Sequence, residues 1–228
     1  MSRRRVYLAR HGAVSYFEPG RVDLVDHDPP LNATGVAQAE ALGQVLAAAP
    51  IDLAVCTGYQ RTRQTAELAT APRELDVQVI QGLSEAQIGT FEEIETAEQM
   101  QATFVKAFEN AAEPGARFLT GEPYADLWDR VAAAWRALLS RSDWSHVFVA
   151  AHGVVNRTIL AQALDSGPQI YRRLEQDTGC LNVLDVEGDG DDARVAFVRL
   201  INFTPYNATK LGMHQTTLEM LWQQFVGG

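Results

Sequence analysis

The chain has 228 residues, of which 46% are hydrophobic and 21% are charged, a composition that suits a globular protein with a sizeable core. Its formal net charge of −10 and pI near 4.9 argue against a general binder of nucleic acid or of anionic membranes, because such proteins are normally basic. The sequence shows no signal peptide and no apolar stretch near the roughly 18 residues of a membrane span, so we expect a cytoplasmic protein.

The first half of the chain alternates strand and helix patterns. A β-branched and aromatic run predicts a strand at 6–9, and a proline-punctuated loop follows it. We then expect a helix at 34–49, a strand at 52–57, a helix at 59–69 and a strand at 76–80. The segment after residue 80 has turn residues and little periodicity, which predicts an irregular loop.

The second half begins with helical patterns and ends with strands. Helices are expected at 92–112 and 125–139, followed by the most apolar strand, 146–153, and a helix at 154–164. Strands at 180–187 and 194–202 flank a Gly-Asp-Gly-Asp-Asp hairpin turn, and a last helix is expected at 213–225. The alternation predicts an α/β fold in one domain, 1–228. It would be a three-layer α/β/α structure with a mostly parallel central sheet and a terminal antiparallel hairpin.

Two of the predicted strands end in the same dipeptide. His11-Gly12 follows the first strand, and His152-Gly153 follows the most apolar one. In open α/β sheets ligands bind outside the carboxyl ends of the strands, so both imidazoles should face one site. The helix expected after His152 has free N–H groups in its first turn, Val154 among them, and these favour an anion. One such histidine is more often structural, but the matched pair favours a functional site.

Cations and one acid accompany these histidines. Arg10 precedes His11, and Arg61 lies at the start of a helix just after a strand; a guanidinium grips phosphate in a bidentate way. Arg63 should point elsewhere on that helix, to solvent. Glu85 lies in the irregular loop, where it can reach a cleft. Cys56 and Cys180 are expected to be buried thiols, since two isolated cysteines make no disulfide framework.

The ordered set of motifs resembles the histidine phosphatase superfamily, also called phosphoglycerate-mutase-like. The matching pieces are ARHG at 9–12, PLNATGVAQAEALG at 30–43, RTRQTAE at 61–67, LSEAQIG at 83–89, GEPYADLWDRV at 121–131 and VAAHG at 149–153. They run in the family's order from Val6 to about Val186. The single RHG is weak, whereas the ordered set is a strong signal.

The resemblance implies a role for each matched residue. His11 would be the nucleophile that becomes a phosphohistidine, and His152 its electrostatic partner on the transferring group. Arg10 and Arg61 would hold the phosphoryl oxygens, and Glu85 would protonate the leaving group. Further phosphate contacts are expected from Gly12, Ser15 and Val154. The resemblance implies a small phosphorylated substrate and no metal or other cofactor, and a homodimer remains open.

The departures from the family pattern concern the substrate more than the chemistry. Phe17 stands where many members carry an asparagine that touches phosphate, and Ser15 is our guess for its substitute. The segment 90–121, a lid-like insertion, carries six acidic and two basic residues, unlike the basic insertions expected of a phosphoglycerate mutase. Hydrolysis is therefore favoured over mutase-type phosphoryl transfer. The segments that cover the site contain four aromatic residues, from which we expect an apolar lid: Tyr16, Phe17, Phe104 and Phe108.

Two other classes of function stay open at this stage. One is a non-catalytic binder of a phosphorylated ligand. The other is a metal hydrolase, for which Asp26, His27 and Asp28 offer ligands that His11 and His152 could join. No HExxH spacing supports a metal, and the two aspartates are better explained as turn formers before Pro29 and Pro30.

Overall fold

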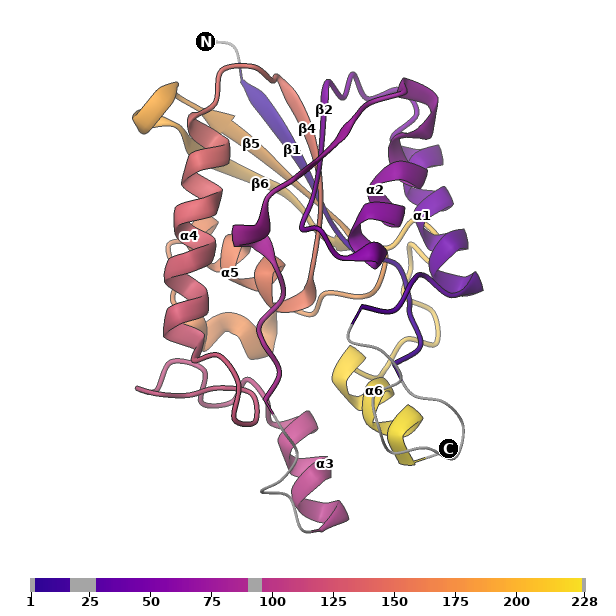
Figure 1. The fold of residues 1–228 in the computed structure, drawn as a ribbon, viewed down its shortest axis with the longest axis vertical. Helices are drawn as coiled ribbons and strands as arrows, with labels where there is room; N and C mark the ends of the chain where they lie inside the picture. Colours follow the sequence, from indigo (N-terminus) through magenta and orange to yellow (C-terminus); the bar gives the residue numbers. More distant parts are fainter. Residues whose placement is uncertain (1–2, 17–27, 90–95, 227–228) are drawn as a thin grey trace.

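A computed structural model describes residues 3–16, 28–89 and 96–226 of the chain. Its centre is a six-stranded sheet in the order β3-β2-β4-β1-β5-β6 (Figure 1). The strands are β1 Arg4–Arg10, β2 Leu53–Cys56, β3 Val77–Val79, β4 His146–Ala151, β5 Leu181–Glu187 and β6 Arg194–Phe203. The first four run parallel, whereas β5 is antiparallel to both β1 and β6. The predicted mostly parallel sheet with a terminal antiparallel hairpin is confirmed.

Helices cover both faces of the sheet (Figure 1). Alternate residues of β1 separate two cores: Val6 and Leu8 pack towards α4 and α5, while Tyr7 and Ala9 pack towards α1 and α2. This confirms the three layers. The helices are α1 Ala33–Val45, α2 Gln60–Thr70, α3 Ala97–Val105, α4 Tyr124–Ser140, α5 Gly153–Ala163 and α6 Thr217–Val226, with short 3₁₀ turns at Ala71–Arg73, Gln81–Leu83, Pro168–Arg173 and Gly190–Asp192.

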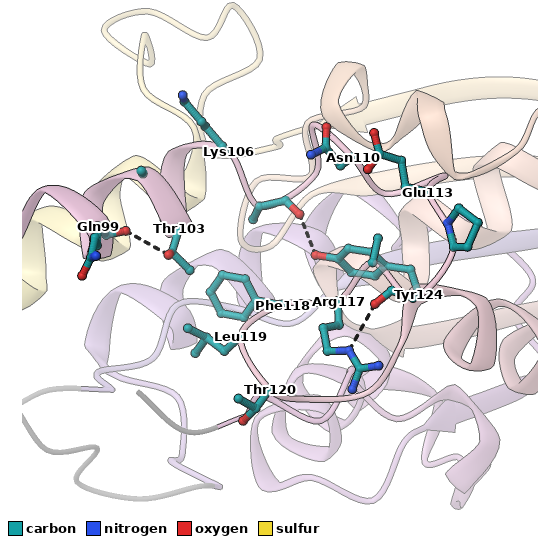
Figure 2. A pocket seen from close by; sticks show the side chains of 15 residues that line it. Gln99, Thr103, Lys106, Asn110, Glu113, Arg117, Phe118, Leu119, Thr120 and Tyr124 are labelled. Carbon is teal, nitrogen blue, oxygen red and sulfur yellow. Dashed lines mark hydrogen bonds between the residues drawn. The ribbon is translucent and has the colours of Figure 1, made fainter. Parts of the chain in front are cut away.

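Helices α3 and α6 lie beyond the carboxyl ends of strands β1 and β4 (Figure 1). They pack on each other, with the rings of Phe104 and Trp222 6.2 Å apart. The chain between α3 and α4 forms turns around a hollow of about 720 Å³ on this side of the molecule (Figure 2). The Tyr124 hydroxyl closes one wall by donating to the Ala107 carbonyl at 2.7 Å.

The expected helices at 92–112 and 213–225 are wrong at their ends. A capping box between Thr96 and Gln99 starts α3, and consecutive turns replace the helix from Lys106 onward. Residues 92–95 lie outside the described chain. Helix α6 starts at Thr217 because Thr216 and Glu219 bond each other's backbone N–H groups, a second capping box.

Core packing accounts for both cysteines, which are buried and free as expected. In the described chain we find no helix with the length and apolar character that a bilayer crossing needs.

The turn after β1 depends on a close approach of two glycines. A Cβ on Gly12 would lie 2.4 Å from the Gly35 carbonyl oxygen, and a Cβ on Gly35 would lie 2.1 Å from the Ala13 carbonyl oxygen. No side chain fits at either position, because the obstacle is backbone. The start of α1 therefore packs directly on the segment that follows His11.

We predict that Gly35→Ala destabilises the protein although it raises helix propensity. The propensity gain is about 1 kcal/mol, while the backbone clash should cost on the order of 1–3 kcal/mol or more. Chemical denaturation of Gly167→Ala is the matched control, since a Cβ there meets only the end of the Gln169 side chain. If Gly35→Ala and Gly167→Ala had equal free energies of unfolding, the close backbone approach of Gly12 and Gly35 would be contradicted.

Candidate active site

The two His-Gly ends meet because β1 and β4 are neighbours in register. Arg10 pairs with Ala151, so the next residue of each strand is a histidine at the same level of the sheet. The His11 N–H donates to the Ala151 carbonyl at 3.0 Å. The two imidazole centroids lie 5.4 Å apart with the rings inclined at 66°, and both side chains are buried.

The surroundings of His11 fix its tautomer. Its Nδ1 lies 2.7 Å from the Gly12 carbonyl oxygen, which can only accept, so Nδ1 carries the proton and Nε2 keeps its lone pair. Burial, helped by the positive charges of Arg10 and Arg61, lowers the pKa of His11 well below its usual value. The ring is therefore neutral at neutral pH, as a nucleophile requires.

His152 is held from the neighbouring strand β2. Its Nε2 shares a hydrogen bond of 2.8 Å with the Thr57 hydroxyl, and the Tyr59 ring meets it edge-on at 5.3 Å. Burial lowers its pKa well below the usual value, and the charges of Arg61 and Arg10 add to that effect. Its Nδ1 is buried without a hydrogen-bond partner in the described chain. His152 Nδ1 is therefore a buried ring nitrogen that is available for a hydrogen bond to a ligand.

Two guanidinium groups converge on the same place. Arg61 is buried on the first turn of α2, lies 4.3 Å over the Tyr59 ring, and has Nη1 3.5 Å from the Asp28 carboxylate. Arg10 donates from Nη1 to the Gln176 carbonyl at 2.6 Å. The Nε atoms of both arginines are buried with no hydrogen-bond acceptor among the residues that the structure describes. Buried cations with unused donors favour an anionic ligand.

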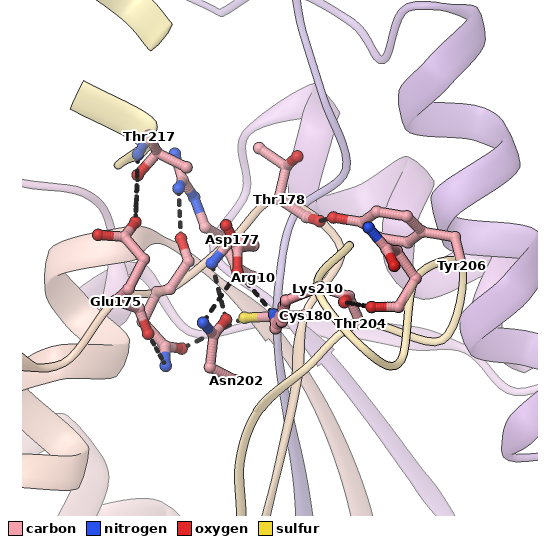
Figure 3. A network of polar contacts seen from close by, with 12 residues as sticks. Arg10, Glu175, Asp177, Thr178, Cys180, Asn202, Thr204, Tyr206, Lys210 and Thr217 are labelled. Atoms are coloured by element: carbon pink, nitrogen blue, oxygen red, sulfur yellow. Dashed lines mark hydrogen bonds and ion pairs between the residues drawn. The ribbon is translucent and has the colours of Figure 1, made fainter. Parts of the chain in front are cut away.

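The loop that holds Arg10 is itself fixed from the C-terminal part of the chain (Figure 3). Next to Gln176, the Asp177 carboxylate accepts from Asn202 at 2.9 Å and from Lys210 at 2.6 Å. On its other side, Glu175 accepts from the Thr217 hydroxyl at 2.7 Å, where α6 starts. Arg10 is therefore positioned by an anchored backbone carbonyl rather than by a mobile side chain.

Glu85 lines a cleft of about 440 Å³ together with Tyr59 and with Thr57, the hydrogen-bond partner of His152. It follows the 3₁₀ turn Gln81–Leu83 and is partly buried. Burial raises the pKa of Glu85, although the Ala86 N–H and the charges of Arg10 and Arg61 oppose the rise. A carboxyl with a raised pKa beside an anion site is suited to donate a proton.

Sequence reasoning missed a third guanidinium, that of Arg157. It lies on α5 one turn after Gly153, is buried, and donates to the Tyr171 carbonyl at 3.2 Å and to Glu175 at 3.1 Å. A Cβ on Gly153 would lie 3.3 Å from its Nη1 and 3.5 Å from Arg10 Cζ. Gly153 is thus covered by two cations. In the sequence, a role for Arg157 is indicated only by its position one helical turn after Gly153, and an exposed arginine would fit that spacing equally well.

The remaining expected phosphate contacts are less favourably placed. The Gly12 N–H donates to Thr65 Oγ1 at 3.0 Å, so Gly12 fixes the turn and has no free donor in this structure. Ser15 is exposed and accepts from the Asn32 side chain at 3.3 Å. Val154 lies in the first turn of α5, where N–H groups lack helical partners.

The expected apolar lid is wrong for two of its four aromatics, which belong to the core. Phe104 packs on Phe118 and Trp222, and Phe108 packs on Tyr124 and Tyr171. Tyr16 lies near the site, since the charges of Arg61 and Arg10 act on its hydroxyl. Phe17 lies outside the described residues.

The alternative of a metal site finds no support in the placed residues. Asp28 lies at a bend before Pro29, and its carboxylate accepts from the Gln60 N–H at 2.8 Å, at the start of α2 and next to Arg61. Across residues 3–16, 28–89 and 96–226 no group of three or more potential ligands gathers. Asp26 and His27 lie outside this part of the chain. The larger hollow of Figure 2 contains none of the predicted catalytic residues.

Comparison with known proteins points to one family. A family model described as the histidine phosphatase superfamily, branch 1, matches residues 6–198. A probable 2-carboxy-D-arabinitol-1-phosphatase from Arabidopsis thaliana is 31% identical over 206 residues, which is 89% of this chain and 42% of that protein. The adenosylcobalamin/alpha-ribazole phosphatase of Escherichia coli is 26% identical over 205 residues, 87% of this chain and 95% of that protein. The chain spans about two fifths of the length of its plant relatives.

Solved structures share the fold. Mycobacterial hydrolase 2 superposes with a TM-score of 0.73 at 22% identity, covering 94% of this chain and 100% of that one. A mycobacterial glucosyl-3-phosphoglycerate phosphatase gives 0.69 at 22% identity, covering 88% and 99%.

We predict that His11 stays neutral in solution at pH values where a free imidazole is half protonated, about 6.5. The cause is burial beside Arg10 and Arg61. A pH titration of the imidazole resonances by NMR measures this, with His11→Asn to assign the signals. Inorganic phosphate should raise the apparent pKa of His11, because an adjacent anion stabilises the protonated ring. A titration near 6.5 that ignores phosphate would contradict the geometry.

Proposed function

This chain belongs to branch 1 of the histidine phosphatase superfamily, and from that membership we propose that it hydrolyses a small phosphate monoester through a phosphohistidine on His11. The observation that carries the proposal is the pair of buried imidazoles 5.4 Å apart, on which the charges of Arg10 and Arg61 both act. The composition and charge favour action in the cytoplasm on a soluble metabolite.

The first step forms the phosphoenzyme. The lone pair of His11 Nε2 attacks phosphorus while the bond from phosphorus to the ester oxygen breaks. Glu85 in its protonated form gives that oxygen a proton, so the alcohol leaves neutral. The Gly12 carbonyl, 2.7 Å from Nδ1, stabilises the positive charge that the ring acquires.

The second step returns the enzyme to its starting state. Glu85, now ionised, accepts a proton from water as the water oxygen attacks phosphorus. The bond between phosphorus and Nε2 breaks, and its electron pair returns to the ring. Phosphate leaves, and Glu85 is again protonated, so the two steps consume one water per ester.

The cations lower the barrier of both steps. Negative charge spreads over the equatorial phosphoryl oxygens in the transition state, and Arg10 and Arg61 offer fixed donors to it. A bound dianion also favours proton uptake by His152, whose pKa is lowered by burial and by these same cations. Replacing Arg61 by alanine should therefore cost about 100–1000-fold in kcat.

The cleft next to the phosphoryl site suits a hydrophilic leaving group. Its lining is polar: Asp28, Gln81, Ser84, Gln87 and Arg130 all contribute. The named relatives at 26–31% identity include phosphatases of a carboxylated sugar alcohol phosphate and of alpha-ribazole. We propose sugar phosphates and phosphorylated hydroxy acids as the substrate class, to be tested with a panel of such esters.

A mutase-type transfer is the second candidate, because a relative 29% identical over 172 residues is named a probable phosphoglycerate mutase. The two activities differ in product. Hydrolysis of a phosphoglycerate releases inorganic phosphate, whereas a mutase moves the phosphoryl group between hydroxyls.

The intermediate gives a direct test. Rapid acid-free quenching with a ³²P-labelled ester should leave label on the protein that is labile in acid and stable in base, and His11→Ala should abolish label and turnover. His146→Ala is the matched control, since His146 starts β4 at the opposite end from the site. Full labelling of the His11 variant would rule out the proposed nucleophile, and turnover that chelators abolish would favour a metal hydrolase.

The pH dependence follows from the directions of the two pKa shifts. Activity on an alkyl ester should rise with pH as His11 loses its proton, below the usual imidazole range. It should fall at higher pH as Glu85 ionises, at a pH raised above the usual carboxyl range. Glu85→Gln should remove the alkaline fall and reduce kcat about 100-fold or more. Substrate ionisation affects both enzymes equally, so an unchanged alkaline limb in the variant would exclude Glu85 as the acid.

A further inference from the structure

Glu85 is the one proposed catalytic residue that lies neither within nor directly beside a strand or an α-helix. It lies in the segment 84–89, after the 3₁₀ turn Gln81–Leu83, and among the residues that the structure describes its carboxylate accepts a hydrogen bond only from the Ala86 N–H, at 3.1 Å. A general acid must nevertheless point at the leaving oxygen within hydrogen-bond reach. Something outside this segment has to fix its direction.

Arg130 on α4 grips the backbone on both sides of Leu83. Its Nη1 donates to the Gly82 carbonyl and to the Ser84 carbonyl, each at 2.9 Å. Gly82 itself presses on α4, where a Cβ on it would lie 2.6 Å from the Ala134 Cβ. The backbone immediately before Glu85 is therefore docked on α4 through one guanidinium.

Glu122 completes the grip from the other side. Its carboxylate binds Arg130 in a bidentate way, with Nε donating at 3.0 Å and Nη2 at 2.7 Å, and its backbone N–H donates to the Gln87 carbonyl at 3.0 Å. Close contact of Gly121 with Gln87 continues this docking. One residue thus orients the guanidinium that holds the chain before Glu85 and also holds the chain after it.

We propose that the Arg130–Glu122 pair is the positioning device of the catalytic acid, which it aims at the leaving oxygen by fixing the backbone on both sides of Glu85. The proposal rests on the proposed function, since it needs Glu85 to be the acid. Both members of the pair are mostly buried, so the ion pair is shielded from water and geometrically strict. Arg130 also lines the cleft, and direct binding of substrate is the competing role that the test must separate.

The discriminating measurement is the dependence on the leaving group. p-Nitrophenolate leaves with little help from an acid, whereas an alkyl alkoxide needs the proton of Glu85. A misdirected acid should therefore slow alkyl esters selectively. Because Glu85 also serves the later water attack, which is common to all esters, the comparison uses kcat/KM, which reports formation of the phosphoenzyme. We expect Arg130→Ala to lower kcat/KM about 100-fold for the best alkyl ester of the panel and less than about threefold for p-nitrophenyl phosphate. Inhibition by inorganic phosphate should stay near wild type.

Three further variants make the result decisive. Glu122→Gln keeps the shape of the side chain and weakens the grip, so it should show the same selectivity to a smaller degree even if Arg130→Ala folds poorly. Arg136→Ala, an exposed arginine on the same helix, is the matched control and should behave as wild type. Arg130→Ala in a Glu85→Gln background should add less than about twofold for the alkyl ester, because an absent acid cannot be misdirected.

The outcomes separate the two proposals. If Glu85→Gln lowers kcat/KM selectively for alkyl esters and the Arg130 and Glu122 variants lower kcat/KM equally for both esters or weaken inhibition by inorganic phosphate, the positioning role is overturned and the acid stands. If the losses of Arg130→Ala and Glu85→Gln multiply, Arg130 acts independently of Glu85 and the proposal is again overturned. If Glu85→Gln itself lacks selectivity, the assigned acid fails, and the positioning role fails with it.

Discussion

The parallel pairing of β1 with β4 is the constraint from which the candidate site follows. Arg10 lies opposite Ala151, so each histidine leaves the sheet at the same level and from adjacent strands. A slip of one residue would send every side chain of one strand to the other face. Core packing forbids this, because Val6 and Leu8 fill one layer while Tyr7 and Ala9 fill the other. The geometry of the site is thus a consequence of hydrophobic alternation.

The net charge of the whole chain and the charge around the candidate site have opposite signs. The chain carries a net −10, yet the positive charges of Arg10 and Arg61 act on two buried, neutral imidazoles. Burying cations is costly unless they are paired. Asp28 and Glu175 supply part of the pairing for Arg61 and Arg157, and the Gln176 carbonyl supplies it for Arg10. The donors left unused are already in place, which is what preorganised stabilisation of an anion requires.

Sequence patterns predict those features of the fold that depend on interactions between residues close together in the chain. Strand ends, four of the six helix starts and the paired His-Gly motifs were predictable, because hydrophobic period and glycine placement act over a few residues. Contacts between segments distant in the sequence were not: Thr57 beneath His152 and Arg157 over Gly153 depend on which strands become neighbours. The two misplaced helix starts have a local cause, since Thr-x-x-Gln at 96 and Thr-x-x-Glu at 216 are capping signals.

The proposed nucleophile and the proposed acid owe their positions to different forces. His11 is held by the sheet register and by the Gly12 turn, so its placement is as stable as the core itself. Glu85 belongs to a segment without a ladder, and its placement depends on a few side-chain bonds to α4 and on the polar insertion that ends at Glu122. In the proposed mechanism, phosphoryl capture therefore depends on the sheet, whereas proton delivery to the leaving group depends on the segment that carries and holds Glu85. Under that proposal substrate choice is a property of this segment, and the sheet that holds His11 need not change with it.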